Sequence, residues 1–150
     1  MKFQFVAFFV LYPYSSIACQ DSVLEISFKG FISTLQIEIA DTPKDRQKGL
    51  MFRDNLDPDL GMLFIYETPR AVKFWMKNTS IPLDIAFANE TGEVLRIAYN
   101  TKPFSLDLID GGEDIQYVLE INAGMSDALN IFVGSKFVLS DFLQQPSVLC

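Results

Sequence analysis

The period at which apolar side chains recur constrains the fold of this chain more than any other feature. Between Val23 and Ala40, apolar residues stand at nearly every second position, with a break at Gly30. A period of two places these side chains on one face of an extended strand and the intervening polar ones on the other. The same pattern, or a short apolar run bounded by turn residues, recurs in segments 61–66, 72–77, 84–88, 94–99, 115–121 and 132–139.

These segments predict about seven to nine short strands, since turn residues interrupt the pattern at short intervals. A short helix is expected to begin after Thr42, which can cap it, with Pro43 at the first helical position and Asp45 at the capping-box position. Segment 126–130 offers one further helical turn. The expected fold class is mainly β, or α+β at the margin: a compact antiparallel β-sandwich or a partly closed barrel with one or two short helices.

The same pattern predicts three connections between strands. Segment 67–70, which contains Pro69, is expected to turn the chain between two separate strands. Segment 78–83 is short enough for a hairpin-like return between strands 72–77 and 84–88. Segment 107–114 carries four acidic residues and two glycines, and it is expected to be an acidic loop.

The composition limits the chemistry. The chain has 150 residues, which suits one domain, and a formal net charge of −7. An acidic surface repels phosphate backbones, so nucleic acid is not an expected partner. Histidine is absent, which removes the usual neutral-pH general base and the commonest metal ligand. We expect no cofactor and no metal, and we interpret the acidic segment 107–114 as a solvated loop rather than a calcium site.

The first eighteen residues read as a secretory signal peptide. Lys2 precedes an apolar run from Phe3 to Tyr14, and Ser16 and Ala18 provide small residues at the positions of a cleavage site. The run is shorter than the roughly 20 residues of a membrane span, although a retained N-terminal anchor is an alternative. The expected location is therefore outside the cytoplasm, either periplasmic or associated with the cell envelope.

Cys19 directly follows this cleavage site and resembles the cysteine that receives lipid chains in bacterial lipoproteins. Two alternatives remain open: a disulfide with Cys150, or two free thiols. After the signal peptide (1–18), we expect an N-terminal linker or first strand (19–30), a β-rich domain (31–141) and a C-terminal tail (142–150).

A polar cluster around one proline-containing turn is the candidate functional site. The hairpin-like return would bring Lys77 and Asp84 together above the apolar layer, with Asn78 beside them and Trp75 on the same face as Lys77. Arg53 would add a second cation for ligand recognition. The plainer interpretation is an ion pair and a turn cap, which contribute about 0–1 kcal/mol when exposed.

The same region carries a family resemblance. The chain resembles the bacterial and archaeal family called domain of unknown function 192, or uncharacterised protein family 0127, in pieces that run in family order over most of the sequence. The resemblance implies a small β-rich domain, often behind a signal peptide or membrane anchor, and no established reaction or ligand. The matching pieces are Ala40-Asp41-Thr42-Pro43, Arg46, Gly49-Leu50-Met51-Phe52-Arg53, Gly61-Met62-Leu63-Phe64, Pro69-Arg70, Phe74-Trp75-Met76-Lys77-Asn78-Thr79, Ile81-Pro82-Leu83-Asp84 and Tyr117-Val118-Leu119-Glu120-Ile121-Asn122-Ala123-Gly124.

Within these pieces, several polar residues are hard to explain by core packing. The leading hypothesis is a non-catalytic exported module that binds a small molecule, a carbohydrate or an envelope partner. One alternative is a histidine-free hydrolase or lyase that uses Lys77 with Asp84 or Glu120 as acid–base groups. Another is a structural envelope protein without a pocket. The candidate ligand-binding residues are Arg53, Trp75, Lys77, Asn78, Asp84 and Glu120.

Overall fold

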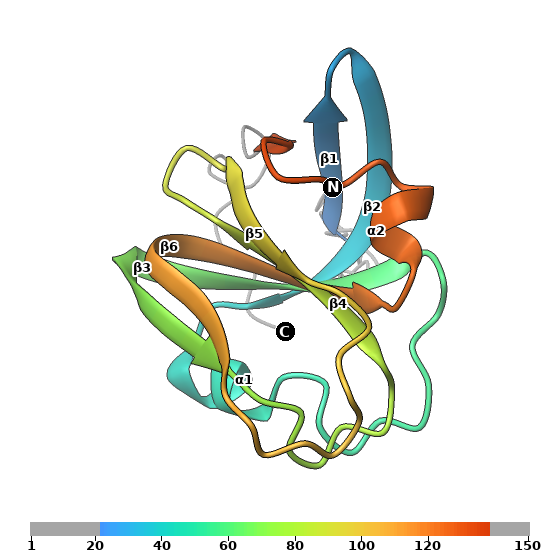
Figure 1. Cartoon of the computed structure of the whole chain (residues 1–150), viewed down its shortest axis with the longest axis vertical. Coiled ribbons are helices and arrows are strands. Elements are labelled where there is room, and N and C mark those ends of the chain that lie inside the picture. The colour runs from blue at the N-terminus through green and yellow to red at the C-terminus, as the bar shows by residue number, and fades with distance from the viewer. Residues whose placement is uncertain (1–21, 139–150) are drawn as a thin grey trace, which may run out of the picture.

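The computed structural model describes residues 22–138, which form a single seven-stranded sheet curled into a half-barrel (Figure 1). The strand order is β5-β4-β6-β3-β2-β1-β7, and neighbouring strands are antiparallel except for the parallel pair β2 and β3. The elements are β1 (Ser22–Phe28), β2 (Phe31–Ala40), α1 (Pro43–Lys48), β3 (Leu60–Phe74), β4 (Leu83–Ala88), β5 (Val94–Ala98), β6 (Ile109–Asn122), α2 (Met125–Ala128) and β7 (Lys136–Val138). The predicted β-rich, partly closed architecture with short helices is confirmed.

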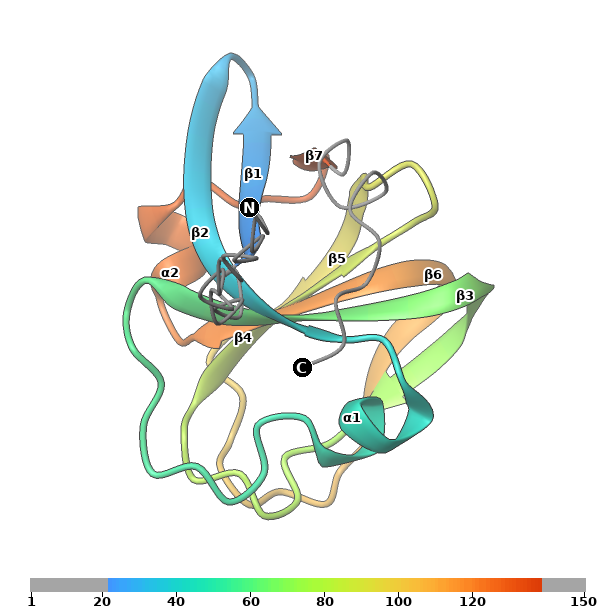
Figure 2. The same ribbon diagram turned by 180° about the vertical axis from the view of Figure 1, so that it is seen from behind.

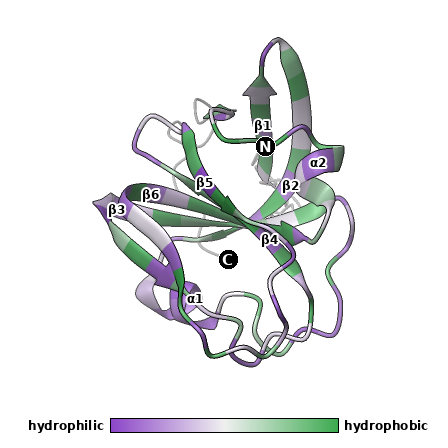
Figure 3. Ribbon diagram, viewed as in Figure 1, coloured by the Kyte–Doolittle hydropathy of each residue, from purple (hydrophilic) through white to green (hydrophobic). Residues whose placement is uncertain are grey.

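Two apolar clusters form, one on each face of the central strands. One contains Leu24, Leu63 and Leu119, and the other contains Phe64 and Val118. Neighbouring residues such as Leu63 and Phe64 fall in different clusters, since successive side chains of a strand point to opposite faces. Every residue of β4 is therefore buried, as expected for a strand covered on both sides. Figure 3 shows the resulting apolar stretches along the central strands.

Helix α1 begins as the sequence predicts. The Thr42 hydroxyl accepts a hydrogen bond from the backbone N–H of Asp45 at 3.2 Å, and Pro43 opens the helix. The helix lies on the crossover that a parallel strand pair requires between β2 and β3. Its Arg46 contacts Ile65 and Glu67 of β3, and its last residues line one side of the candidate site; Figure 2 shows the helix from behind.

The predicted hairpin between segments 72–77 and 84–88 is wrong. Strand β4 pairs with β5 and β6, and β3 pairs with β2 and β6, so β3 and β4 are not neighbours. The turn predicted at 67–70 is also wrong, because β3 continues through it as one strand of 15 residues. Pro69 falls between the paired residues Ile65 and Arg70, where the register shifts and no ladder hydrogen bond is required of it.

Part of the predicted acidic loop 107–114 is strand. Strand β6 begins at Ile109, opposite Phe74, and Asp110 pairs with Lys73. Register shifts on either side of Val72 bend this end of the β3–β6 pair, as β-bulges do. The bend matters for function because it carries Phe74 and the residues that follow it over the face that contains Phe64.

The predictions about both chain ends lie outside the described residues. These are the signal peptide, the roles of Cys19 and Cys150, and the C-terminal tail. Between residues 22 and 138, no helix combines the length and the apolar character that crossing a bilayer requires.

Candidate functional site

A buried carboxyl group on β6 is the centre of the candidate site. Glu120 lies opposite Met62 on β3 and Ile85 on β4, so its side chain points to the same face as theirs. The residue is only 5% exposed. Within residues 22–138, its carboxyl group forms no hydrogen bond and no ion pair at standard distances. An ionisable group this buried and unpaired is uncommon in a folded protein.

Burial changes the chemistry of this group. It raises the pKa of Glu120 from 4.5 to about 8, because the apolar surroundings disfavour the charged form. The side chain is therefore mostly protonated at neutral pH. In that form it donates one hydrogen bond, and it becomes an anion when a proton leaves.

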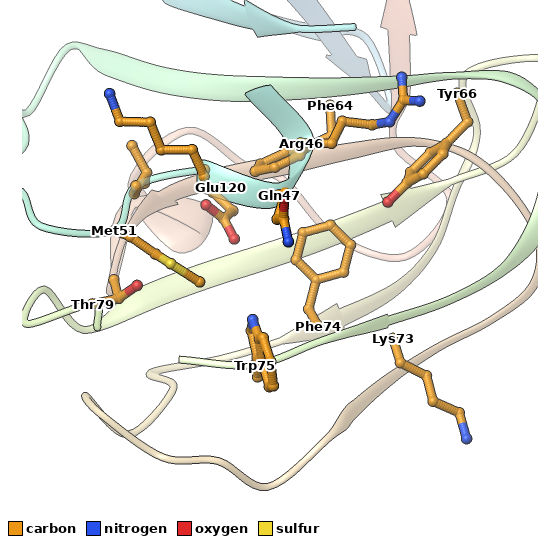
Figure 4. A pocket seen from close by; sticks show the side chains of 13 residues that line it. Arg46, Gln47, Met51, Phe64, Tyr66, Lys73, Phe74, Trp75, Thr79 and Glu120 are labelled. Atoms are coloured by element: carbon orange, nitrogen blue, oxygen red, sulfur yellow. The ribbon is translucent and has the colours of Figure 1, made fainter. Parts of the chain in front are cut away.

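Glu120 opens into a pocket of about 260 Å³. Four aromatic side chains from β3 and the residue after it line this pocket: Phe64, Tyr66, Phe74 and Trp75. Figure 4 shows Phe74 and Trp75 on the side of the pocket facing the Glu120 carboxyl group. The rings of Phe64 and Phe74 meet edge to face at 5.1 Å, which fixes the apolar wall.

The loop after α1 forms the opposite wall. Gly49 ends the helix with a positive φ of 46°, a conformation that favours glycine. A Cβ atom there would lie 3.2 Å from the Phe64 ring and 3.8 Å from a carboxyl oxygen of Glu120. The glycine thus allows the backbone to pass close to the buried carboxyl group, and Met51 reaches into the pocket beside it (Figure 4).

Arg46 lines the pocket but its charge is already engaged. The guanidinium donates hydrogen bonds to the backbone carbonyls of Asp41 and, at 2.7 Å, Ile65. It also pairs with Glu67 at 3.1 Å and lies 4.9 Å from the centre of the Tyr66 ring. Its main effect is to tie α1 to β3 and so to hold the two walls of the pocket together.

The loop segment Gly49–Arg53 is held in place by contacts of Phe52 and Arg53, which lie outside the pocket. Arg53 pairs with Glu38 through its two terminal guanidinium nitrogens, one at 2.7 Å. This hydrogen bond is the main cause of the lowered pKa of Glu38. The positive charges of Arg53 and Lys48 also lower this pKa, whereas burial raises it. The Arg53 carbonyl accepts a hydrogen bond from Ser80, and the Phe52 N–H donates to the carbonyl of Asn78. Arg53 and Asn78 therefore connect two loops and do not line the pocket.

The predicted pairing of Lys77 with Asp84 is wrong. Asp84 is 1% exposed and accepts hydrogen bonds from the backbone N–H groups of Asn100 and Gly124, both at 2.9 Å, and Ser126 at 3.1 Å. It lies opposite Ile121, whereas Ile85 lies opposite Glu120, so Asp84 and Glu120 point to opposite faces of the sheet. Lys77 is exposed, with its ammonium 5.0 Å from the Trp75 ring.

Of the six predicted site residues, Trp75 and Glu120 line the pocket. Arg53, Lys77, Asn78 and Asp84 do not, and their contacts are those of loop and surface structure. Sequence reasoning missed Tyr66 and Phe74 because their aromatic side chains in alternating segments read as ordinary core residues. The polar signal in the sequence was real, but only the fold shows which of these residues share a cavity.

Together the fold and the pocket define a small half-barrel β-domain with a buried acid in an aromatic-lined cavity. Residues 24–139 match the family model of domain of unknown function 192, described as Uncharacterized ACR, and the chain belongs to this family. No curated protein matches the sequence.

The solved structures that are similar to this one include two crystal structures. The first is a protein from Sinorhizobium meliloti 1021 proposed to be a transcription regulator, with 35% identity and a TM-score of 0.76, over 83% of this chain and 97% of that one. The second is a protein of unknown function from Novosphingobium aromaticivorans DSM 12444, with 33% identity and a TM-score of 0.75, over 86% of this chain and 91% of that one. These likenesses support the fold.

Proposed function

We propose that this chain is an exported binding module of the cell envelope that takes a small organic ligand into the pocket above Glu120. The observation that carries the proposal is the buried carboxyl group of Glu120, which opens into an aromatic-lined cavity. An apolar pocket with a few convergent polar groups and a perturbed ionisable residue is the usual form of a small-molecule site.

The free-energy cost of burying the Glu120 carboxyl group supports a functional role for this residue. Burying an unpaired polar group costs about 1–3 kcal/mol, whereas an apolar residue at the same position would add to the core. A purely structural envelope protein has no need of such a group. A ligand that forms a hydrogen bond or ion pair with Glu120 offsets the cost when it binds.

Catalysis by Glu120 is the second candidate function. A carboxyl group with a pKa of about 8 can donate or accept a proton at neutral pH, which is the behaviour of a general acid or base. Among the residues that line the pocket there is no second carboxylate to act with it. The hydroxyl of Thr79 instead donates to the carbonyl of Lys77 at 3.2 Å. These observations favour binding over acid–base chemistry that requires two carboxyl groups.

DNA binding is not carried over from the relative proposed to be a transcription regulator. The net charge of −7 opposes contact with phosphate backbones. The size of the pocket is also more consistent with a small ligand than with DNA.

Trp75 allows a direct test, because it is the single tryptophan of the chain and it lines the pocket. A fragment library is screened by thermal shift and by tryptophan fluorescence against the wild type, Glu120→Gln and Glu113→Gln. Glu113 is an exposed residue of the same strand and serves as the matched control. We expect fragments that stabilise the wild type and the control and change their fluorescence, but act weakly on Glu120→Gln. Fragments that act equally on all three proteins, or none that acts on any, would contradict the proposal.

A further inference from the structure

Resting on this binding function, we propose that the group entering the pocket is a small organic cation, an ammonium or guanidinium, which pairs with the carboxylate of Glu120 beneath the aromatic rings. Three features favour this class of ligand: the unpaired carboxyl group of Glu120, the aromatic rings around it and the volume of the pocket.

Within the described part of the chain, residues 22–138, no cation pairs with Glu120. Of the cations that line the pocket, Arg46 is engaged by Glu67 and two carbonyls, and Lys48 forms no ion pair with Glu120. Figure 4 shows the ammonium of Lys73 directed away from Glu120. A buried carboxylate becomes favourable when a cation pairs with it at close range. The ligand is therefore the natural source of that cation.

The aromatic wall favours the same class of ligand. The face of an aromatic ring attracts a cation, with about 0.5–2 kcal/mol for each contact, more when water is excluded. Three such contacts already occur on the rings of the pocket: Arg46 and Arg70 both lie near Tyr66, and Lys77 lies over Trp75. Phe74 faces the carboxyl group (Figure 4), so an ammonium beside Glu120 would contact both negative charge and ring.

The volume sets an upper size. A cavity of about 260 Å³ lies just below the range of typical drug-sized sites, roughly 300–1,000 Å³. It suits an alkylammonium or alkylguanidinium of a few carbons. Such a group is carried by a free amine or by the side chain of a lysine or arginine in a peptide, and both sources share the chemistry argued here.

The test uses ligands of one shape and different charge: n-butylammonium, n-butylguanidinium, neutral n-butanol and anionic butyrate. Binding to the full chain is measured by Trp75 fluorescence and by calorimetry. We expect the two cations to bind, the alcohol and the anion to bind at least tenfold more weakly, and Glu120→Gln to lose at least tenfold in affinity for the cations. Glu113→Gln is expected to bind like the wild type.

A second readout needs no variant. Because a cation selects the ionised carboxyl group, its affinity is expected to rise about tenfold per pH unit below the pKa of Glu120, with release of one proton on binding. The ionisable groups that face the pocket besides Glu120 are Arg46 and Lys48 from α1 and Lys73 and Tyr66 from β3. Burial raises the pKa of Tyr66, with an opposing effect of Arg46, so this phenol stays neutral throughout.

The outcomes separate the two proposals. If the alcohol or butyrate binds as tightly as the cations and depends on Glu120, the cation proposal is wrong and the binding function stands. If none of the four ligands binds and the fragment screen is also empty, both are wrong. A short peptide with one lysine is compared with free n-butylammonium, and tighter binding of either one identifies the source while supporting the cation class.

Discussion

At the scale of single residues, two acidic side chains on adjacent strands have opposite surroundings although both are buried. Asp84 on β4 accepts three backbone hydrogen bonds from two different loops, whereas Glu120 on β6 accepts none from residues 22–138. The contrast follows from the pleat, since the two residues point to opposite faces of the sheet. Asp84 therefore organises loops, and Glu120 remains available to a ligand.

The pH dependence of stability tests the environment of Glu120. Its pKa is about 8 in the folded state and near 4.5 in the unfolded chain, so between these values the folded protein binds more protons. The free energy of unfolding should then fall as the pH rises through this window, by up to about 1.4 kcal/mol per pH unit. Urea unfolding from pH 5 to 8 should show this fall in the wild type and in Glu113→Gln, but not in Glu120→Gln. Parallel curves for all three proteins would refute the burial argument.

Replacement of Asp84 tests its role in organising loops. Asp84→Ala leaves three backbone N–H groups, one of them on the buried Ser126, without their acceptor, and hydrogen bonds to a charged group contribute about 1.5–3 kcal/mol each. Since such losses overlap, we expect a decrease of about 3 kcal/mol in the free energy of unfolding by urea titration. Asp54→Ala, at an exposed position, should change it by less than about 0.5 kcal/mol. Equal effects of the two substitutions would show that Asp84 has no structural role.

At the scale of elements, the bent end of the β3–β6 pair builds the aromatic wall. Phe74 contacts Phe64 on one side and Phe87 on the other, with the second pair of ring centres 5.7 Å apart. The Phe87 ring packs directly against Gly111, where a Cβ atom would lie 2.5 Å from it. The position of the aromatic wall thus depends on Gly111, which lies near the start of β6, whereas Glu120 lies near its end.

Gly111→Ala should therefore displace Phe87 and, through it, Phe74. Overpacking of this kind costs about 1–3 kcal/mol, and we expect weaker ligand binding at Trp75 as well. The double variant Gly111→Ala with Phe87→Ala removes the ring from this contact and leaves only the methyl group of Val72, 2.6 Å from the added Cβ. Its loss of stability should therefore be smaller than the sum of the single losses. Thermal and urea unfolding measure the coupling. Strict additivity would mean that the two residues do not interact as described.

Local pattern predicts the elements better than their partners. The period of two located most strands, and the Thr42–Pro43 signal located α1, because these features depend on neighbouring residues. The pairing of β4 with β6 was missed because it joins segments about 35 residues apart, and no local signal encodes it. The sequence predicts a turn at Pro69 because the register shift that tolerates this proline within β3 depends on β6.

For the candidate site too, the sequence indicates single residues better than it indicates which residues lie together. Glu120 and Trp75 were found because a carboxylate and an exposed indole are unusual in core-forming segments. Lys77 and Asp84 were wrongly paired because the pairing assumed a hairpin that does not form. A residue type can mark a site in the sequence, but which residues meet is decided by strand order.

At the scale of the whole molecule, export and anchoring would determine which ligands the pocket meets. Strand β1 begins at Ser22, three residues after Cys19. Three extended residues span about 10 Å, so lipidation of Cys19 would hold the sheet close to a membrane surface. The pocket would then sample the small molecules and peptides of the cell envelope, where free amines and lysine side chains are both available.

Expression in a bacterial host with labelled palmitate tests this arrangement. We expect label in the wild type and in Cys150→Ser, recovered with membranes, and loss of both label and membrane association in Cys19→Ser. The thioether consumes the sulfur of Cys19, so lipidation also excludes a disulfide with Cys150. Equal labelling of all three proteins would reject the proposed anchor. A mature protein that is unlabelled, begins at Cys19 and lacks two hydrogens by mass would instead support the disulfide, and it would place the pocket free in the exported space rather than at the membrane.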